Sequence, residues 1–169
     1  MSDHDLRRLG PEEIAGAAWL SQRLLALNNA NARELSWLEP DHFAHLANEA
    51  FLALATENGD AMLLAFDQDA DYDSPNFLWF RGRYARFVYL DRIVVAPSAR
   101  RQGLARRLHQ ALFEHAVKAG HERIVAEINS DPPNPGSDAL HAALGFVEVG
   151  RAAIHGGLKT VNYISRDLV

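Results

Sequence analysis

The residues best suited to do chemistry in this 169-residue sequence lie in one stretch, residues 90–108. An apolar run ends at Pro97 and is followed by Arg100 and Arg101, then by Gly103 and a leucine-rich helical pattern. At such a strand-to-helix turn the first backbone N–H groups of the helix lack helical partners, and the helix dipole favours an anion. Gly103 also allows a ligand to approach the backbone closely. The stretch therefore predicts a phosphate or pyrophosphate site. The alternative is an exposed basic helix start in which Gly103 serves packing.

Two well-known phosphate motifs do not fit this stretch. A Walker loop is excluded because no Gly-Lys-Ser/Thr follows the turn. A dinucleotide-binding fingerprint is excluded because only one of its three glycines is present.

Two segments carry a resemblance to a known family. The run Arg100-Arg101-Gln102-Gly103-Leu104-Ala105 matches the Arg/Gln-x-x-Gly-x-Gly/Ala signature of the GNAT superfamily of acyl-CoA-dependent N-acyltransferases. The family's second segment begins with an asparagine, which is followed three residues later by Ala or Ser. An aromatic or apolar residue followed by tyrosine comes next, and Gly-Phe ends the segment. The residues here that are similar to it are Asn134, Ser137, Leu140, His141, Gly145 and Phe146. Both segments occur in the expected order and together cover residues 86–151.

The resemblance implies a fold and a cofactor geometry. We expect an α/β (α+β) domain with a mixed, mostly antiparallel central sheet flanked by helices, in which two neighbouring parallel strands splay apart. The pantetheine of acetyl-CoA would lie in that gap, with no metal. The residues that the resemblance assigns to the cofactor are Ile93, Val94, Val95, Arg100, Arg101, Gln102, Gly103, Leu104, Ala105, Arg106, Asn129, Asn134 and Ser137. For the two asparagines, turn formation beside Pro132, Pro133 and Pro135 is the alternative.

Acetyl transfer to an amine needs a neutral amine, a polarised carbonyl and a proton for the departing thiolate. Where the family commonly has a tyrosine for the last step, this sequence has His141. Simple packing in the apolar run around it is the alternative. For a general base we select Asp91, which strand alternation places on the same face as Tyr89. A salt bridge with Arg92 or Arg123 is its alternative role, and Glu127 on the next strand is a further candidate.

Composition limits the remaining function classes. The chain has no cysteine, which excludes disulfides, thiolate metal sites and thiol catalysis and fits a reducing, cytoplasmic location. A net charge of −5 argues against a nucleic-acid partner, and no apolar run approaches the roughly 20 residues of a membrane helix. The charge is uneven, however, because residues 92–113 hold five arginines and no acid. That segment is consistent with a local binding site for one phosphorylated cofactor.

Several other signals are set aside. The acidic run at residues 67–73 lacks the glycine and glutamate of a calcium loop, and we expect a solvated loop that attracts a cationic substrate. The eight histidines form no HExxH pattern, so we expect no metal. Four aromatic residues could line an acceptor pocket, and packing in the core or at a homodimer face is the alternative. They are Phe77, Trp79, Phe80 and Tyr84.

The elements that must position these residues follow from periodicity and turn signals. We expect strands at 6–9, 51–56, 62–66, 86–95, 122–128, 146–151 and 159–165. We expect one helix from Pro11 past Leu25, a second at 40–48, a third after a cap near Ser98, and a fourth capped by Ser137. Asn58-Gly59 predicts a type I′ hairpin turn.

We therefore interpret residues 1–169 as one N-acetyltransferase domain that transfers acetyl directly from acetyl-CoA to the primary amine of a small molecule or peptide. Two alternatives stay open: a catalytically silent acyl-CoA-binding or sensing module, and an interaction protein that binds another anion. The first 85 residues carry no motif that identifies the acceptor.

Overall fold

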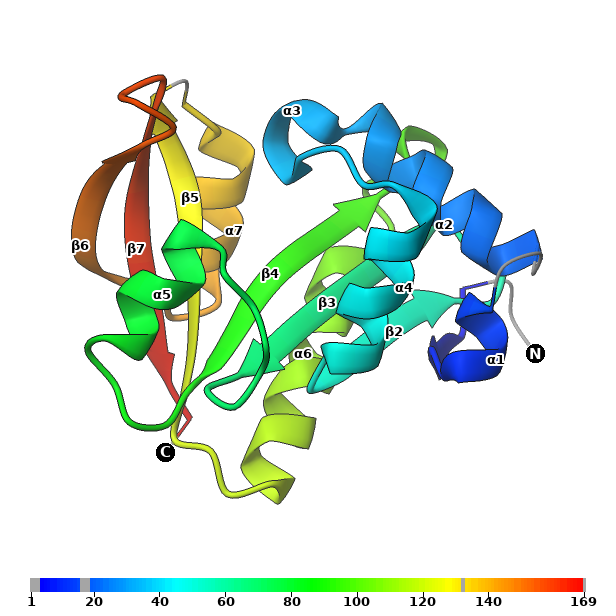
Figure 1. The fold of residues 1–169 in the computed structure, drawn as a ribbon, viewed down its shortest axis with the longest axis horizontal. Coiled ribbons are helices and arrows are strands. Elements are labelled where there is room, and N and C mark those ends of the chain that lie inside the picture. Colours follow the sequence, from blue (N-terminus) through cyan, green and yellow to red (C-terminus); the bar gives the residue numbers. More distant parts are fainter. Residues whose placement is uncertain (1–3, 16–18, 132, 169) are drawn as a thin grey trace.

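The chain forms one seven-stranded sheet covered by helices on both faces (Figure 1). This computed structural model describes residues 4–15, 19–131 and 133–168. The strand order is β1-β2-β3-β4-β5-β7-β6, and every neighbouring pair is antiparallel except β4–β5. The strands are β1 (Leu6–Arg8), β2 (Leu52–Thr56), β3 (Ala61–Asp67), β4 (Val88–Val95), β5 (Arg123–Asp131), β6 (Val147–Ile154) and β7 (Lys159–Asp167). The expected mixed, mostly antiparallel sheet is confirmed.

The helices are short apart from α2 and α6. They are α1 (Pro11–Ile14), α2 (Trp19–Ala30), α3 (Ala32–Leu35), α4 (Pro40–Glu49), α5 (Pro75–Arg81), α6 (Leu104–Lys118) and α7 (Pro135–Ala143). Four of them begin at a proline, whose fixed φ suits the first helical position and whose missing N–H costs nothing there. None of the helices in the described ranges is long and apolar enough to cross a membrane.

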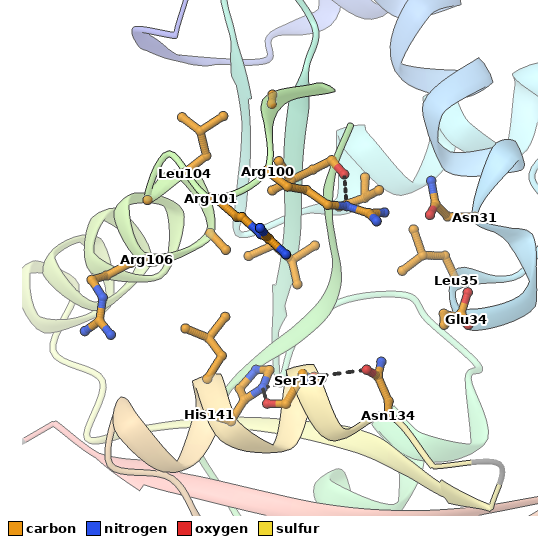
Figure 2. Close-up of a pocket in the computed structure, with 18 residues that line it drawn as sticks. Asn31, Glu34, Leu35, Arg100, Arg101, Leu104, Arg106, Asn134, Ser137 and His141 are labelled. Atoms are coloured by element: carbon orange, nitrogen blue, oxygen red, sulfur yellow. Dashed lines mark hydrogen bonds between the residues drawn. The ribbon is translucent and has the colours of Figure 1, made fainter. Parts of the chain in front are cut away.

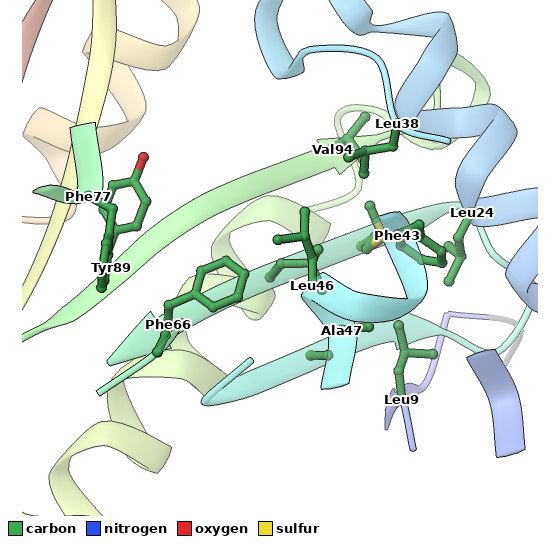
Figure 3. Close-up of a cluster of buried hydrophobic side chains, with 14 of the residues drawn as sticks. Leu9, Leu24, Leu38, Phe43, Leu46, Ala47, Phe66, Phe77, Tyr89 and Val94 are labelled. Carbon is green, nitrogen blue, oxygen red and sulfur yellow. The ribbon is translucent and has the colours of Figure 1, made fainter. Parts of the chain in front are cut away.

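Strand alternation divides the core between the two faces of the sheet. On β3, Met62, Leu64 and Phe66 pack on one face while the residues between them pack on the other. The first face is covered by α2, α4 and α5, with side chains such as Phe43 and Leu46 buried against it (Figure 3). The second face is covered by α6 and part of α7. There the leucines at 104, 108 and 112 are buried, as their four-residue spacing predicts.

The one parallel pair of strands separates soon after it forms. Its ladder joins Val88 to Ile124 and Tyr89 to Val125. Beyond Tyr89, β4 keeps pairing with β3 while β5 keeps pairing with β7, so the two strands diverge (Figure 1). The backbone edge of β4 that faces β5 is therefore free to pair with something else. This is the splayed arrangement expected from the sequence.

The N-terminal half and the segment before β4 differ from the expected elements. The single helix expected from Pro11 past Leu25 is instead α1 and α2, because Ala15 is extended; residues 16–18 lie outside the described residues. The second helix, α2, runs to Ala30, and Asn31 then caps α3, which follows it. The acidic loop is followed directly by α5, which begins at Pro75 with Ser74 as its N-cap and was not expected.

Three turn predictions were also wrong in detail. Asn58 does not have a positive φ; the turn after β2 is closed by Gly59 N–H donating to Thr56 O, with Gly59 alone left-handed, so it is not type I′. Ser98 lies in a short 3₁₀ turn, and Gly103 is the N-cap of α6. Ser137 is inside α7, because the cap is Asn134.

Candidate functional site

A cavity of about 660 Å³ opens at the end of the sheet where β4 and β5 have separated. Its walls come from α3, the end of β4, the start of α6 and the start of α7 (Figure 2). The lining residues are Asn31, Glu34, Leu35, Ile93, Val94, Val95, Ala99, Arg100, Arg101, Gly103, Leu104, Ala105, Arg106, Asn134, Gly136, Ser137, Leu140 and His141. Segments from both halves of the chain therefore build one site.

The turn that begins α6 is built to receive an anion. Gly103 caps the helix with a φ of 76° and offers no side-chain bond to the first N–H groups. Arg101 is also left-handed, with a φ of 64°. Left-handed residues in a turn direct successive N–H groups into one concavity, and the helix dipole adds to the attraction. A Cβ on Gly103 would meet nothing within 4 Å, so the glycine is required by backbone conformation and not by packing.

Most of the residues expected to bind the cofactor line this cavity. The exceptions are Gln102, which is exposed and outside the lining, and Asn129, which lines a second, smaller cavity. Asn134 caps α7, because its Oδ1 accepts from Ser137 N–H at 3.3 Å, and its side chain faces the cavity (Figure 2). Arg100 is held near β4 by a long bond from its Nε to Val95 O, 3.4 Å.

The second cavity, about 120 Å³, lies between the diverging strands. It shares wall residues with the first, among them Leu35, Ile93 and His141, so the two spaces adjoin. Three carboxylates line it, those of Glu34, Asp91 and Glu127, and no lysine or arginine is part of its lining. Its polar character is therefore acidic, opposite to the basic entrance at α6.

Asp91 occupies a β-bulge. Leu64 pairs with Arg92 and Ala65 with Leu90, which leaves Asp91 as the extra residue on β4. Its carboxylate accepts from the Tyr72 hydroxyl at 2.9 Å and from Arg92 Nε at 3.1 Å. The salt bridge with Arg92 considered from the sequence is thus formed. Burial raises the pKa of Asp91, and the Arg92 charge opposes that shift.

Arg123, the other candidate partner of Asp91, instead places its guanidinium 4.2 Å from the centre of the Tyr84 ring.

Arg92 ties α3 to the sheet. Both Arg92 and Asp91 side chains are only 7% exposed. The Arg92 Nη1 donates to Asn28 Oδ1 and to Ser36 O, each at 3.1 Å, and also to Leu35 O. These acceptors fix the end of α3, which carries Glu34 and Leu35 into both cavities.

Glu127 lies on β5 where the strands have already separated. Its Oε2 accepts from the Tyr89 hydroxyl at 2.8 Å. Burial, followed by the negative charge of Asp91, raises the pKa of Glu127 to about 8. A carboxyl group with such a pKa can exchange protons near neutral pH, which is the property required of a general base.

His141 is buried in α7 on the wall between the cavities. Its Nδ1 lies 2.8 Å from Ser137 O and 3.2 Å from Ser137 Oγ, while its Nε2 faces His109 Nε2 at 3.3 Å. Burial lowers the pKa of His141, and the bond to Ser137 O opposes this. The side chain is therefore packed between α6 and α7 and also borders the cavity.

The sequence reasoning did not find α3 or His109. Asn31, Glu34 and Leu35 come from a segment for which no element was expected, and no spacing signal marked them. His109 shows a helical spacing with the buried leucines of α6, which was a usable signal of burial.

The aromatic group proposed for an acceptor pocket lines neither cavity. Phe77 and Phe80 are fully buried in the core, and Trp79 stacks on Tyr163 with ring centres 4.1 Å apart. Among the described residues, no group of three or more His, Asp or Glu is placed to hold a metal ion.

The model of the Acetyltransferase (GNAT) family matches residues 31–146. Comparison of the sequence with curated proteins gives no significant match.

Solved structures resemble the chain along nearly its whole length. The ribosomal-protein-S18-alanine N-acetyltransferase from Escherichia coli aligns with 18% identity and a TM-score of 0.67, over 98% of this chain and 94% of that one. Ard1 from Thermoplasma volcanium aligns with 12% identity and a TM-score of 0.73, over 99% of each chain. The protein yncA from Salmonella typhimurium, solved with its cofactor acetyl-CoA, aligns with 18% identity and a TM-score of 0.67, over 99% of this chain and 95% of that one.

These identities establish the fold alone, whereas the family match covers well over half of the sequence and includes both motif segments. The chain therefore belongs to the GNAT family, and its enzyme class is that of an acetyltransferase.

Proposed function

We propose that the protein transfers the acetyl group of acetyl-CoA directly to a primary amine. The observation that carries this proposal is the adjacency of two unlike spaces. A cavity with an anion-binding helix start opens into an acidic cavity that contains a carboxyl group with a pKa near neutrality. The first suits a phosphorylated carrier and the second suits an amine that must lose a proton.

The cofactor residues divide by the chemistry they offer. The backbone N–H groups from Arg101 to Ala105 face a pyrophosphate, and Arg100, Arg101 and Arg106 add positive charge. The unpaired edge of β4 from Leu90 to Val95 offers N–H and C=O groups to the pantetheine amides, as an added strand would. Asn129 and Asn134 reach the same arm from the other side of the gap.

The two buried carboxylates take different parts in the reaction. Glu127 accepts the proton of the attacking amine, because its pKa of about 8 lies close to neutral pH. Asp91 acts in the catalytic site as a fixed negative charge, because its oxygens accept hydrogen bonds from Tyr72 and Arg92. Its charge also helps to raise the pKa of Glu127.

His141 supplies the proton for the departing sulfur, from the wall that both cavities share. With no cysteine in the chain, an acyl-enzyme on a thiol is excluded, and direct transfer is the simpler course. Cytoplasmic location and the possibility of a homodimer stay predictions from the sequence.

The acceptor is proposed to be cationic before it is deprotonated, because Glu34, Asp91 and Glu127 line the smaller cavity. A small-molecule amine and a peptide amine both meet this requirement. The Escherichia coli structural neighbour is an N-acetyltransferase of an alanine in a ribosomal protein, which is one reason to include N-terminal peptides in a test.

Calorimetry and thiol release test the proposal in sequence. CoA should bind, and ATP and NAD should bind far more weakly because they lack pantetheine. Acetyl-CoA should then release thiol on a panel of polyamines, amino acids and N-terminal peptides. A protein that does not bind CoA would refute the cofactor assignment. A protein that binds CoA but releases no thiol with any amine would instead be a silent acyl-CoA-binding module.

A further inference from the structure

Two buried histidines, His109 of α6 and His141 of α7, contact each other beside the larger cavity. His109 is 0% exposed and His141 is 5% exposed. Their Nε2 atoms face each other at 3.3 Å, with the ring planes at 81°. Only His141 reaches the cavity, and His109 lies behind it (Figure 2 shows His141 on the cavity wall).

The contacts of the four ring nitrogens set a proton requirement. His109 Nδ1 lies 2.7 Å from Ala105 O, and His141 Nδ1 lies 2.8 Å from Ser137 O. A backbone carbonyl only accepts, so each Nδ1 needs a proton to make these bonds. A neutral imidazole carries one N–H, which would leave two bare Nε2 atoms facing each other. These three contacts are satisfied together only when the pair holds three protons and therefore one positive charge. With two protons, His141 Nδ1 gives up its bond to Ser137 O and accepts from Ser137 Oγ at 3.2 Å instead.

The free protein resists this third proton. Burial lowers the pKa of His109 to about 4 and also lowers the pKa of His141. The charged groups that act on the pair are Arg106 on α6, which disfavours the cation, and Asp138 on α7, which favours it. The remaining side is apolar, since the rings of Phe113 and Phe146 pack against His109. Near neutral pH the pair therefore lacks its bond from His141 Nδ1 to Ser137 O, and a nearby negative charge would favour uptake of the third proton.

We propose that His109 is a positioning residue for His141, and that the pair takes up one proton when CoA binds and holds it between the two Nε2 atoms. The proposal rests on the assignment of the larger cavity to CoA made above. The phosphates of CoA bring negative charge to the cavity that His141 lines, and this charge offsets the repulsion by Arg106. His109 then orients His141 by the shared N–H···N bond and by its own bond to Ala105 O.

The shared proton has a defined use in the reaction. When the neutral amine attacks, the N–C bond forms, and the proton released from nitrogen goes to the Glu127 carboxylate. The C–S bond breaks, and the sulfur leaves with the electron pair and takes the proton of the histidine pair. The pair returns to its neutral form, and Glu127 passes its proton to solvent, which also takes the proton that the acceptor ammonium loses before attack. Solvent reprotonates the pair when the next acetyl-CoA binds.

The experiment measures the protons that accompany CoA binding. The full chain is titrated with CoA by calorimetry at pH 7.5 in phosphate and in Tris, two buffers with different ionisation enthalpies. The dependence of the heat on the buffer gives the number of protons exchanged. Wild-type protein should take up close to one proton per CoA, and its affinity for CoA should fall by up to about tenfold per pH unit above neutrality.

His109→Gln and His121→Gln are the matched variants. Glutamine cannot carry the shared cation, so His109→Gln should bind CoA without the proton. Thiol release by this variant should keep the rise with pH that Glu127 causes but lose the fall at higher pH that deprotonation of the pair causes. His121 is also buried, at 6% exposure, but packs on Phe51 and lines neither cavity. His121→Gln should keep the uptake.

CoA binding without proton uptake in the wild type overturns the inference and leaves the cofactor assignment intact. Uptake that persists in both His109→Gln and His141→Gln also overturns it, because the proton then binds elsewhere. Absence of CoA binding overturns the cofactor assignment itself and this inference with it. The absence of uptake in the wild type overturns the inference even if a variant fails to fold.

Discussion

The hydroxyl of Tyr89 donates a 2.8 Å hydrogen bond to Glu127 across the last point at which β4 and β5 are paired. Tyr89 is the final residue of the β4–β5 ladder, and Glu127 lies two residues beyond its end on β5. The bond therefore anchors the carboxyl group at the inner end of the gap. There the carboxyl group is buried and faces the charge of Asp91, which together raise its pKa.

Replacement of Glu127 by glutamine should abolish most of the catalytic rate. A general base contributes about 10²–10⁴-fold, and glutamine keeps the size of the side chain while removing that function. The wild-type rate should rise with pH through about 8, because only the deprotonated carboxylate accepts a proton and its pKa is about 8. The kcat of thiol release, followed from pH 6 to 9.5 with the best acceptor of the panel, checks both statements.

Two further variants separate this role from a general loss of charge. Asp91→Asn removes the negative charge that helps to raise the pKa of Glu127, so the rise in rate should move to lower pH. Glu122→Gln alters an exposed carboxylate just before β5 and should leave the profile unchanged. A wild-type rate in Glu127→Gln would show that another group removes the proton.

The same carboxyl group should make folding stability depend on pH. Its ordinary pKa is 4.5 and its folded pKa is about 8, so the folded state holds a proton that the unfolded chain has released between these values. The stabilising contribution is complete below pH 4.5 and is lost as the pH rises through 8. Urea unfolding of wild type and Glu127→Gln at pH 5, 7 and 9 checks this. The free energy of unfolding should fall less with pH in the variant, and parallel curves would contradict the raised pKa.

Arg92 should be among the charged residues that matter most to stability. Arg92→Met would leave the buried Asp91 carboxylate without its cation and the ends of α2 and α3 without a donor. Breaking a buried ion pair in this way costs about 3–5 kcal/mol. Arg151→Met is the control, because its pair with Glu148 is exposed, at 66% and 46%, and should contribute about 0–1 kcal/mol. Equal losses in urea unfolding would refute the special role of Arg92.

The sequence predicted the parts of the fold that local patterns determine. Seven strands, the basic helix start at residues 100–105 and the separation of β4 from β5 were all expected, because strand alternation, glycine chemistry and the two motif segments are local signals. The short helices α3 and α5 were missed. Each has no more than seven residues, and such a helix is stabilised by tertiary contacts, such as Arg92 at the end of α3, which periodicity does not reveal.

The site was predicted in part for the same reason. Residues of the α6 turn could be placed because one turn supplies them. The relation between Asp91 and Glu127 could not be ranked, because it depends on a bulge in β4, on Tyr72 and on Arg92. These groups are distant in sequence, and only burial decides which carboxyl group keeps a proton near neutral pH.

Gly103→Ala should weaken CoA binding more than it weakens the fold. The left-handed φ of 76° costs a residue with a Cβ about 1 kcal/mol, although no atom obstructs the Cβ itself. Gly156→Ala is the matched control, with a φ of 65°, an equally open position and a place in the turn between β6 and β7. Both variants should lose similar stability, but only Gly103→Ala should raise the Kd for CoA, by about tenfold if that strain shifts the turn. An unchanged Kd in both would argue against the α6 turn as the pyrophosphate site.

Gly150→Ala should destabilise the fold through Trp79. A Cβ at Gly150 would lie 2.5 Å from Cζ2 and 2.7 Å from Cη2 of Trp79, closer than atoms tolerate. The ring has little freedom to move, because it stacks on Tyr163 at 4.1 Å and the Arg83 guanidinium lies 3.6 Å from its centre. Overpacking of this kind costs about 1–3 kcal/mol. Gly136→Ala is the control. Its Cβ meets nothing within 4 Å, and within α7 alanine is the better helix former by about 0.5–1 kcal/mol, so stability should hold or rise. Thermal unfolding of the two variants decides between them, and a Gly150→Ala variant as stable as the wild type would mean that Trp79 has another position available.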